Sequence, residues 1–131
     1  RLQAIPVRDH CVPAPVTGRI SDPLAEVVTR LRASDWSEAC ITDDSGRFQG
    51  VLTAESRADT WQAALSPPAL CFDENTSVME AMEQVRGFVG DAIPVVDSAS
   101  GALIGVVTEA AVISAYLDVS TALRREENAV L

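Results

Sequence analysis

Residues 91–116 read DAIPVVDSASGALIGVVTEAAVISAY and contain the pattern that decides the fold of this chain. A short run rich in β-branched residues, 93–96, is followed by a polar, glycine-containing turn, 97–101, and by a second apolar run, 102–107. Two such runs joined by a short turn predict a β-hairpin. Helical spacing of apolar residues begins after Thr108. We therefore expect a strand, a turn, a strand and a helix, in that order.

The same unit occurs earlier in the chain, in residues 39–53, ACITDDSGRFQGVLT. Asp43 corresponds to Asp97 at an offset of 54 (97−43), and Gly50 corresponds to Gly105 at an offset of 55 (105−50). The one-residue difference falls in the turn, where an insertion is tolerated most easily. A repeat of this length predicts two structural units that bury each other's apolar faces.

At these motifs the chain resembles a tandem pair of CBS domains, also called a Bateman module, over residues 12–118. IPVVD and GVVT in the second copy match the family pattern closely, and ACITD and GVLT in the first match it more loosely. The resemblance implies an α/β fold in which two β-α-β-β-α repeats pack pseudo-symmetrically as one compact module. We assign residues 1–15 to a mostly extended lead-in segment, 16–66 to the first repeat, and 67–131 to the second repeat with an extended C-terminal helix.

Apolar spacing and capping residues predict where the helices lie. We expect helices over residues 23–33, 54–65, from 77 onward, and 109–127. Asp22 is the expected N-cap of the first of these helices, and Ser77 with Glu80 fits a capping box at the third. A short strand is expected over residues 69–72. The buried face of the third helix is predicted to consist of Val78, Met82, Val85 and Val89.

Composition excludes several classes of function. The formal net charge of −9 argues against binding to nucleic acid, which is driven by cationic side chains, and against an anionic membrane surface. The longest apolar run, 102–107, is too short to insert across a bilayer. The three cysteines, Cys11, Cys40 and Cys71, have no zinc-ligand spacing and are interpreted as free thiols in a reducing compartment. The start at Arg1, without a methionine, is interpreted as a cut within a longer protein or as the start left after a tag is removed.

Sequence motifs of catalysis are missing, and the chain is interpreted as non-enzymatic. His10 and Cys11 are adjacent in a segment expected to be extended, so their side chains point in opposite directions and do not form a catalytic pair. Alternating strands and helices also suggest a dinucleotide-binding fold, but no G-x-G-x-x-G follows a strand. The sequence therefore favours a binding or regulatory module.

The resemblance implies that a cleft between the repeats can hold an adenine nucleotide. Thr53 and Thr108 stand where the family places a Thr or Ser near the phosphate or the ribose. Each is expected to cap a helix, whose N-terminus favours anions. Ser56 and Ala111 stand where the family has an Asp that holds the ribose, which argues against a strong, ribose-selective site. Weak binding of ATP, ADP or AMP, binding of a different ligand, and no ligand at all stay open. The candidate cleft residues are Thr53, Ser56, Thr108, Ala111, Ile93 and Pro94.

The preferred functional hypothesis is the regulatory domain of a ClC-type chloride channel or exchanger. The ending AYLDVSTALRREENAVL resembles the closing helix and charged tail of bacterial ClC-type proteins. This hypothesis implies a homodimer formed through the CBS-pair helices, a transmembrane transport domain in the same chain, and a location at the cytoplasmic face of the cell membrane. Two alternatives stay open: an adenine-nucleotide sensor of a soluble enzyme, and a dimerisation domain without a ligand.

Overall fold

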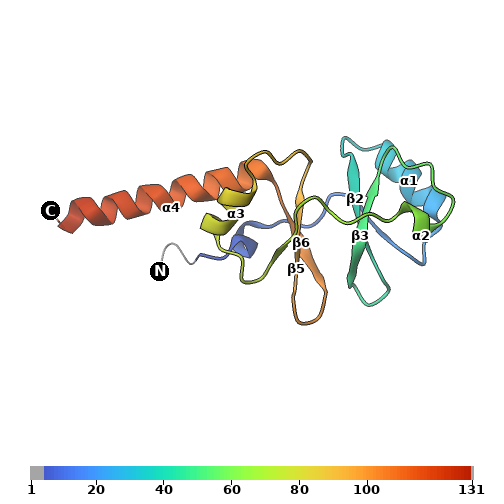
Figure 1. The fold of residues 1–131 in the computed structure, drawn as a ribbon, viewed down its shortest axis with the longest axis horizontal. Helices are drawn as coiled ribbons and strands as arrows, with labels where there is room; N and C mark the ends of the chain where they lie inside the picture. Colours follow the sequence, from blue (N-terminus) through green and yellow to red (C-terminus); the bar gives the residue numbers. More distant parts are fainter. Residues whose placement is uncertain (1–4, 131) are drawn as a thin grey trace.

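The computed structural model describes residues 5–130, so residues 1–4 of the lead-in and residue 131 of the second repeat lie outside the described part. Its elements form two halves placed end to end, with a long helix that extends away from the second half (Figure 1). In chain order they are η2 (Val7–His10), β1 (Thr17–Arg19), α1 (Leu24–Arg32), β2 (Glu38–Thr42), β3 (Phe48–Thr53), α2 (Trp61–Ala64), β4 (Phe72–Asp73), α3 (Val78–Gln84), β5 (Ile93–Val96), β6 (Leu103–Val107) and α4 (Glu109–Val130).

Each half contains one three-stranded sheet, with the order β1-β2-β3 in the first half and β4-β5-β6 in the second. In both sheets the first strand pairs in parallel with the second, and the second pairs in antiparallel with the third. A β-bulge interrupts both hairpins, between Ile41 and Thr42 in one and between Val95 and Val96 in the other. The predicted α/β arrangement of two β-α-β-β-α units is therefore confirmed.

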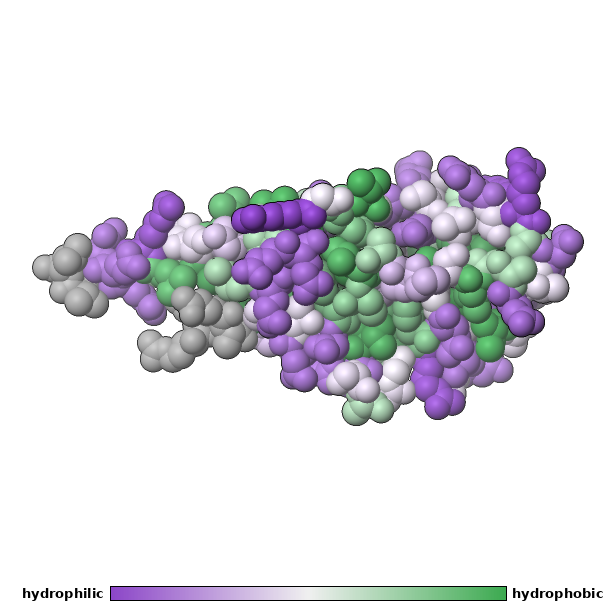
Figure 2. Space-filling model, in the orientation of Figure 1, coloured by the Kyte–Doolittle hydropathy of each residue, from purple (hydrophilic) through white to green (hydrophobic). Residues whose placement is uncertain are grey.

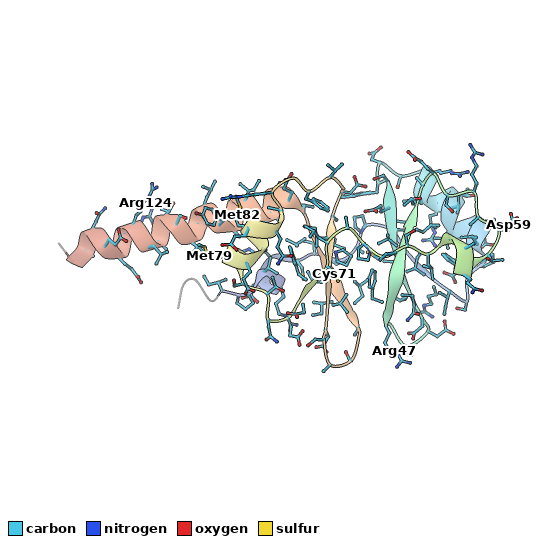
Figure 3. The ribbon with its side chains drawn as sticks, viewed as in Figure 1. Arg47, Asp59, Cys71, Met79, Met82 and Arg124 are labelled. Atoms are coloured by element: carbon cyan, nitrogen blue, oxygen red, sulfur yellow. The ribbon has the colours of Figure 1, made fainter. Side chains whose placement is uncertain are left out.

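Each half has its own hydrophobic core. In the first half, Val27 and Leu31 from α1 are fully buried beside Ile41 and Leu52 of the sheet. The core of the second half contains Phe72, Val85, Ile93 and Val107, together with residues of the lead-in and of α4. A further cluster joins α3 to α4 through Val78, Ala115 and Val119. Figure 3 shows Met79 and Met82 on α3, beside α4, and Met82 packs against the core of the second half.

The lead-in differs from the extended segment that we expected. Residues 7–10 form a turn of 3-10 helix, and Val7 is fully buried in the core of the second half. Val12 then pairs with Val106 on β6 through two backbone hydrogen bonds, each 2.8 Å long. On the other sheet, Ser66 pairs with Val51 on β3 in the same reciprocal way, at 2.8 and 3.0 Å. The segment that precedes the first strand of each half therefore completes the other half.

The helix predicted over residues 54–65 is reduced to the single turn Trp61–Ala64. Arg32 donates hydrogen bonds from Nε to the carbonyl of Ala54 and from Nη2 to the carbonyl of Ser56, at 2.7 and 2.9 Å. The Ser56 hydroxyl accepts the N–H of Ala58 at 3.3 Å. These contacts occupy groups that a helix needs for its own hydrogen bonds, so the segment forms a loop. Thr60, and not Thr53, caps the turn.

Three further local expectations are wrong. The carboxylate of Asp22 accepts the N–H of Arg19 at 2.9 Å, and Pro23 precedes α1 without a side-chain cap. Helix α3 ends at Gln84, before the left-handed Gly87, and leaves Val89 with 90% of its surface exposed. The strand predicted over residues 69–72 consists of Phe72 and Asp73.

Two helix starts are confirmed. Ser77 and Glu80 form the expected capping box. Thr108 accepts the N–H of Ala111 on its hydroxyl at 3.1 Å, and α4 begins at the next residue. Helix α4 runs for 22 residues, three beyond the predicted end at 127, and its far end is largely hydrophilic (Figure 2). Among residues 5–130, no helix has both the length and the hydrophobicity required to cross a bilayer.

Candidate functional site

The two halves meet across a pseudo-two-fold axis at their hairpin turns. Phe48 donates its N–H to the carbonyl of Gly101 at 2.9 Å, and Leu103 donates its N–H to the carbonyl of Gly46 at 3.1 Å. Phe48 and Leu103 are equivalent positions of the two repeats (103−48 = 55), and so are Gly46 and Gly101 (101−46 = 55). Each turn therefore makes the same contact with the other, as in an isologous interface. In Figure 1 both hairpins point in the same direction.

A second contact on this axis joins Ser37, which precedes β2, to Asp91, which precedes β5. Both the backbone N–H and the hydroxyl of Ser37 donate to Oδ2 of Asp91, the hydroxyl at 2.7 Å. A carboxylate that accepts two hydrogen bonds holds its partner more firmly than a neutral acceptor does. This pair therefore fixes the starts of two central strands relative to each other.

The space between the halves is small. A cavity of about 20 Å³ lies between Pro15, Trp36 and Cys40 on one side and Pro94 and Val106 on the other. This volume suits about one water molecule, whereas pockets for organic ligands have roughly 300–1,000 Å³. This cavity is therefore too small to hold a nucleotide.

Two carboxylates, Glu38 and Asp91, and one thiol, Cys40, line this cavity. Burial raises the pKa of Glu38, and the nearby carboxylate of Asp91 raises it further. Burial also raises the pKa of Cys40 to about 11, with smaller contributions from Glu38 and Cys71. A thiol with so high a pKa stays protonated at neutral pH and is a poor nucleophile. The thiol of Cys40 is thus suited to packing and not to catalysis.

The six predicted site residues do not share one pocket. Pro94 lines the small cavity, while the neighbouring Ile93 is fully buried in the core of the second half. Thr108 caps α4, and Ala111 packs partly buried against the second core. Their assignment as ligand-binding residues stays a prediction.

The corresponding residues of the first half lie in a different setting. The carbonyl of Thr53 accepts the N–H of Ser56 at 3.1 Å, within the loop that replaces the expected helix. Ser56 lines a groove beside α1, and it is not among the residues that line the inter-repeat cavity. The expected cap at Thr53 was wrong, so the anion site predicted at a helix N-terminus does not form there.

The sequence analysis did not identify Ser37, Glu38 and Asp91 as residues of this contact, although the repeat offset relates two of them. Ser37 and Asp91 are 54 residues apart, the same offset that relates the two strand motifs. Residues at equivalent positions in a two-fold repeat meet each other wherever the axis passes near them. Within residues 5–130, no group of three or more His, Cys, Asp or Glu side chains is arranged to hold a metal ion.

Comparison with known proteins agrees with this architecture. The family model described as "CBS domain" matches residues 7–56 and 62–118. A CBS domain pair/ACT domain protein from Thermotoga maritima is similar, with a TM-score of 0.70 at 21% identity, over 87% of this chain and 98% of that one. Comparison with curated protein sequences finds no significant match.

Two similar structures contain nucleotides. CBSX2, a protein known from Arabidopsis thaliana, in complex with AMP has a TM-score of 0.68 at 18% identity, over 88% of this chain and 98% of that one. The CBS domain of a bacterial CNNM/CorC family Mg²⁺ transporter in complex with ATP has a TM-score of 0.65 at 22% identity. The match covers 88% of this chain and 89% of that one. At these identities the likeness concerns the fold, which is that of a CBS pair.

Proposed function

The chain belongs to the CBS domain family, and from this membership we propose that it is a non-catalytic regulatory module in which displacement of one repeat relative to the other carries the signal. The pseudo-two-fold contact supports this proposal. Separate cores hold each repeat together, whereas the contact across the axis includes the Ser37–Asp91 pair and the reciprocal bonds between the turns. A contact of this kind can shift between two arrangements without unfolding either core.

We further propose that the regulatory signal does not require tight binding of an adenine nucleotide. The cavity between the repeats has about 20 Å³, and Ser56 and Ala111 offer no carboxylate to a ribose. Hydrogen bonds to a charged group contribute about 1.5–3 kcal/mol, so their loss weakens binding by roughly 10- to 150-fold. Calorimetric titration of the purified chain with ATP, ADP and AMP tests this proposal. We expect no sub-millimolar binding; sub-millimolar affinity would instead support the nucleotide-sensor alternative.

The parent protein that we propose is a membrane transporter of the ClC type, with the module at its cytoplasmic face and the transport domain in the same chain. The resemblance of the sequence 115–131 to the closing helix of bacterial ClC-type proteins supports a parent of the ClC type. The similar fold of a Mg²⁺ transporter's CBS domain supports a transporter more generally. The module is proposed to form homodimers through its helices, among which α4 exposes Ile113 and Leu117. The division into units 1–15, 16–66 and 67–131 stays a proposal, in which the lead-in packs on the second repeat.

The coding sequence upstream of Arg1 gives the sharpest test of the parent. Ten or more encoded segments long enough to span a bilayer, and chloride flux from vesicles that contain the full protein, are the expected results. Removal of the module is expected to change that flux without abolishing it. A soluble domain upstream would contradict the transporter proposal. Light scattering on the isolated module tests the dimer separately, and a monomer at tens of micromolar would contradict it.

A further inference from the structure

A groove of about 410 Å³ lies on the first repeat, between α1 and the loop 56–59. One wall is a face of α1 that includes Leu24, Val28 and Arg32, and the other includes Ser56, Arg57 and Asp59. Asp59 lies at the end of the molecule far from α4, in Figure 3. The groove is therefore separate from the cavity between the repeats, and its volume falls within the range of small-molecule sites.

The loop that forms one wall of the groove lies where a helix was predicted. Arg32 fixes the loop through its bonds to the carbonyls of Ala54 and Ser56. A guanidinium has five N–H donors, and these two bonds use one at Nε and one at Nη2. The remaining donors, those of Nη1 included, are available to a ligand. Arg32 is thus both a support of the loop and a part of the groove.

The charges on the groove differ from those of the chain as a whole. Arg32 and Arg57 contribute two positive charges and Asp59 one negative charge, although the chain carries a net charge of −9. Among residues 5–130, the one ion pair joins Arg47 to Asp43, so Arg57 is not neutralised by a carboxylate contact. Guanidinium groups bind carboxylates and phosphates through paired N–H donors. Two of them on one groove favour a ligand with an oxyanion group.

The other part of the groove is apolar. Leu24 and Val28 are partly buried and pack against the core of the first half, so their positions are fixed by the fold. They give the groove a hydrophobic wall opposite the charged loop. An inorganic ion would leave this wall uncovered, whereas an anion with an apolar body would cover it.

We propose that this groove binds a small organic anion, whose carboxylate or phosphate-monoester group contacts Arg32 and Arg57 and whose apolar body lies on Leu24 and Val28. The ligand is held within the first repeat alone and does not enter the inter-repeat cavity. The site stands independently of the proposed transporter parent, since binding can be measured on the isolated chain.

The test is an NMR titration of the ¹⁵N-labelled chain with benzoate, phenyl phosphate and inorganic phosphate. We expect benzoate or phenyl phosphate to shift the amide signals of α1 and residues 56–59, and inorganic phosphate to bind more weakly. Which of the two organic probes binds more tightly distinguishes a carboxylate site from a phosphate site. Shifts confined to the inter-repeat residues, or no shifts with any probe at millimolar concentration, would overturn the proposal.

Two variants and a control sharpen this test. Arg57→Gln, whose side chain supports no other described contact, is expected to weaken binding by at least about fivefold. Ala25→Phe adds a ring to an exposed position on the wall of the groove and is expected to block the organic probes. Arg30→Gln is the matched control, because Arg30 lies on the same helix but bonds to the carbonyl of Thr17. Unchanged affinity in Arg57→Gln, or equal loss in Arg30→Gln, would contradict the assignment.

Discussion

Ser37 and Asp91 occupy equivalent positions of the two repeats, 54 residues apart, and are hydrogen-bonded to each other through both the backbone and the side chain of Ser37. The pseudo-two-fold axis therefore passes close to this pair. Glu38, the next residue along from Ser37, carries a carboxylate near that of Asp91. The same few residues thus hold the repeats together and place two acidic groups against each other.

Removing the hydroxyl of Ser37 tests this contact. Ser37→Ala is expected to lower the free energy of unfolding by about 1 kcal/mol, since one hydrogen bond to a carboxylate is lost. In the Asp91→Ala background the same change is expected to cost much less, because the acceptor is already absent. Urea denaturation of the wild type, the two single variants and the double variant measures the coupling energy between Ser37 and Asp91. Ser45→Ala, in an exposed turn, is the control. Additive effects would show that the pair does not contribute.

The raised pKa of Glu38 predicts a pH-dependent effect on stability. A carboxyl whose pKa is higher in the folded state contributes stability below its unfolded pKa, and this contribution is lost as pH rises through the folded pKa. Glu38→Gln removes the charge, so the variant is expected to be more stable than the wild type at pH 7. The difference should shrink as pH falls toward the ordinary pKa of a glutamate.

The measurement is urea denaturation of both proteins between about pH 4 and pH 7. Asp43, Glu74 and Asp97 have lowered pKa values because of hydrogen bonds, and their contribution is lost as pH falls. That contribution is common to wild type and variant and cancels in the comparison. Glu55→Gln, at an exposed position, is the control. A difference that grows toward acid pH would have the wrong sign for this account.

The burial of Val7 predicts that the lead-in is part of the second core. Val7→Ala removes two methyl groups from a fully buried side chain and is expected to lower the free energy of unfolding by about 2 kcal/mol. Val12→Ala is the matched control, because that side chain is 53% exposed while its backbone makes the pairing with β6. Equal, small effects of both changes would mean that the lead-in does not stabilise the fold.

The close approach of the lead-in to β6 depends on Gly105. A Cβ atom at this position would lie 2.6 Å from the carbonyl oxygen of Val12. Gly105→Ala is therefore expected to displace the lead-in, to cost about 1–3 kcal/mol, and to speed hydrogen exchange of the Val12 amide. Gly46→Ala is the comparison, because a Cβ there would meet no non-neighbouring atom within 4 Å and any cost comes from the left-handed backbone, φ +86°. Unchanged exchange at Val12 in Gly105→Ala would contradict the steric explanation.

Local patterns predicted well those features that depend on neighbouring residues. The hairpins, the capping box at Ser77, and α4 after Thr108 all follow from short-range spacing and side-chain to backbone bonds. The helix predicted after Thr53 was wrong because Arg32, which is distant in sequence, donates hydrogen bonds to the carbonyls of Ala54 and Ser56. Tertiary hydrogen bonds overrode local propensity there.

The repeated strand motifs alone predicted a doubled strand-helix unit, and the resemblance of IPVVD and GVVT to CBS domains added the fold of the pair. Only the tertiary structure decided that the lead-in completes the second repeat, that the cavity between the repeats is nearly filled, and that a separate groove with Arg32 and Arg57 opens beside α1. Periodicity indicates which face of each element is buried, because it depends on residues close in sequence, whereas a site depends on contacts between residues far apart in the chain.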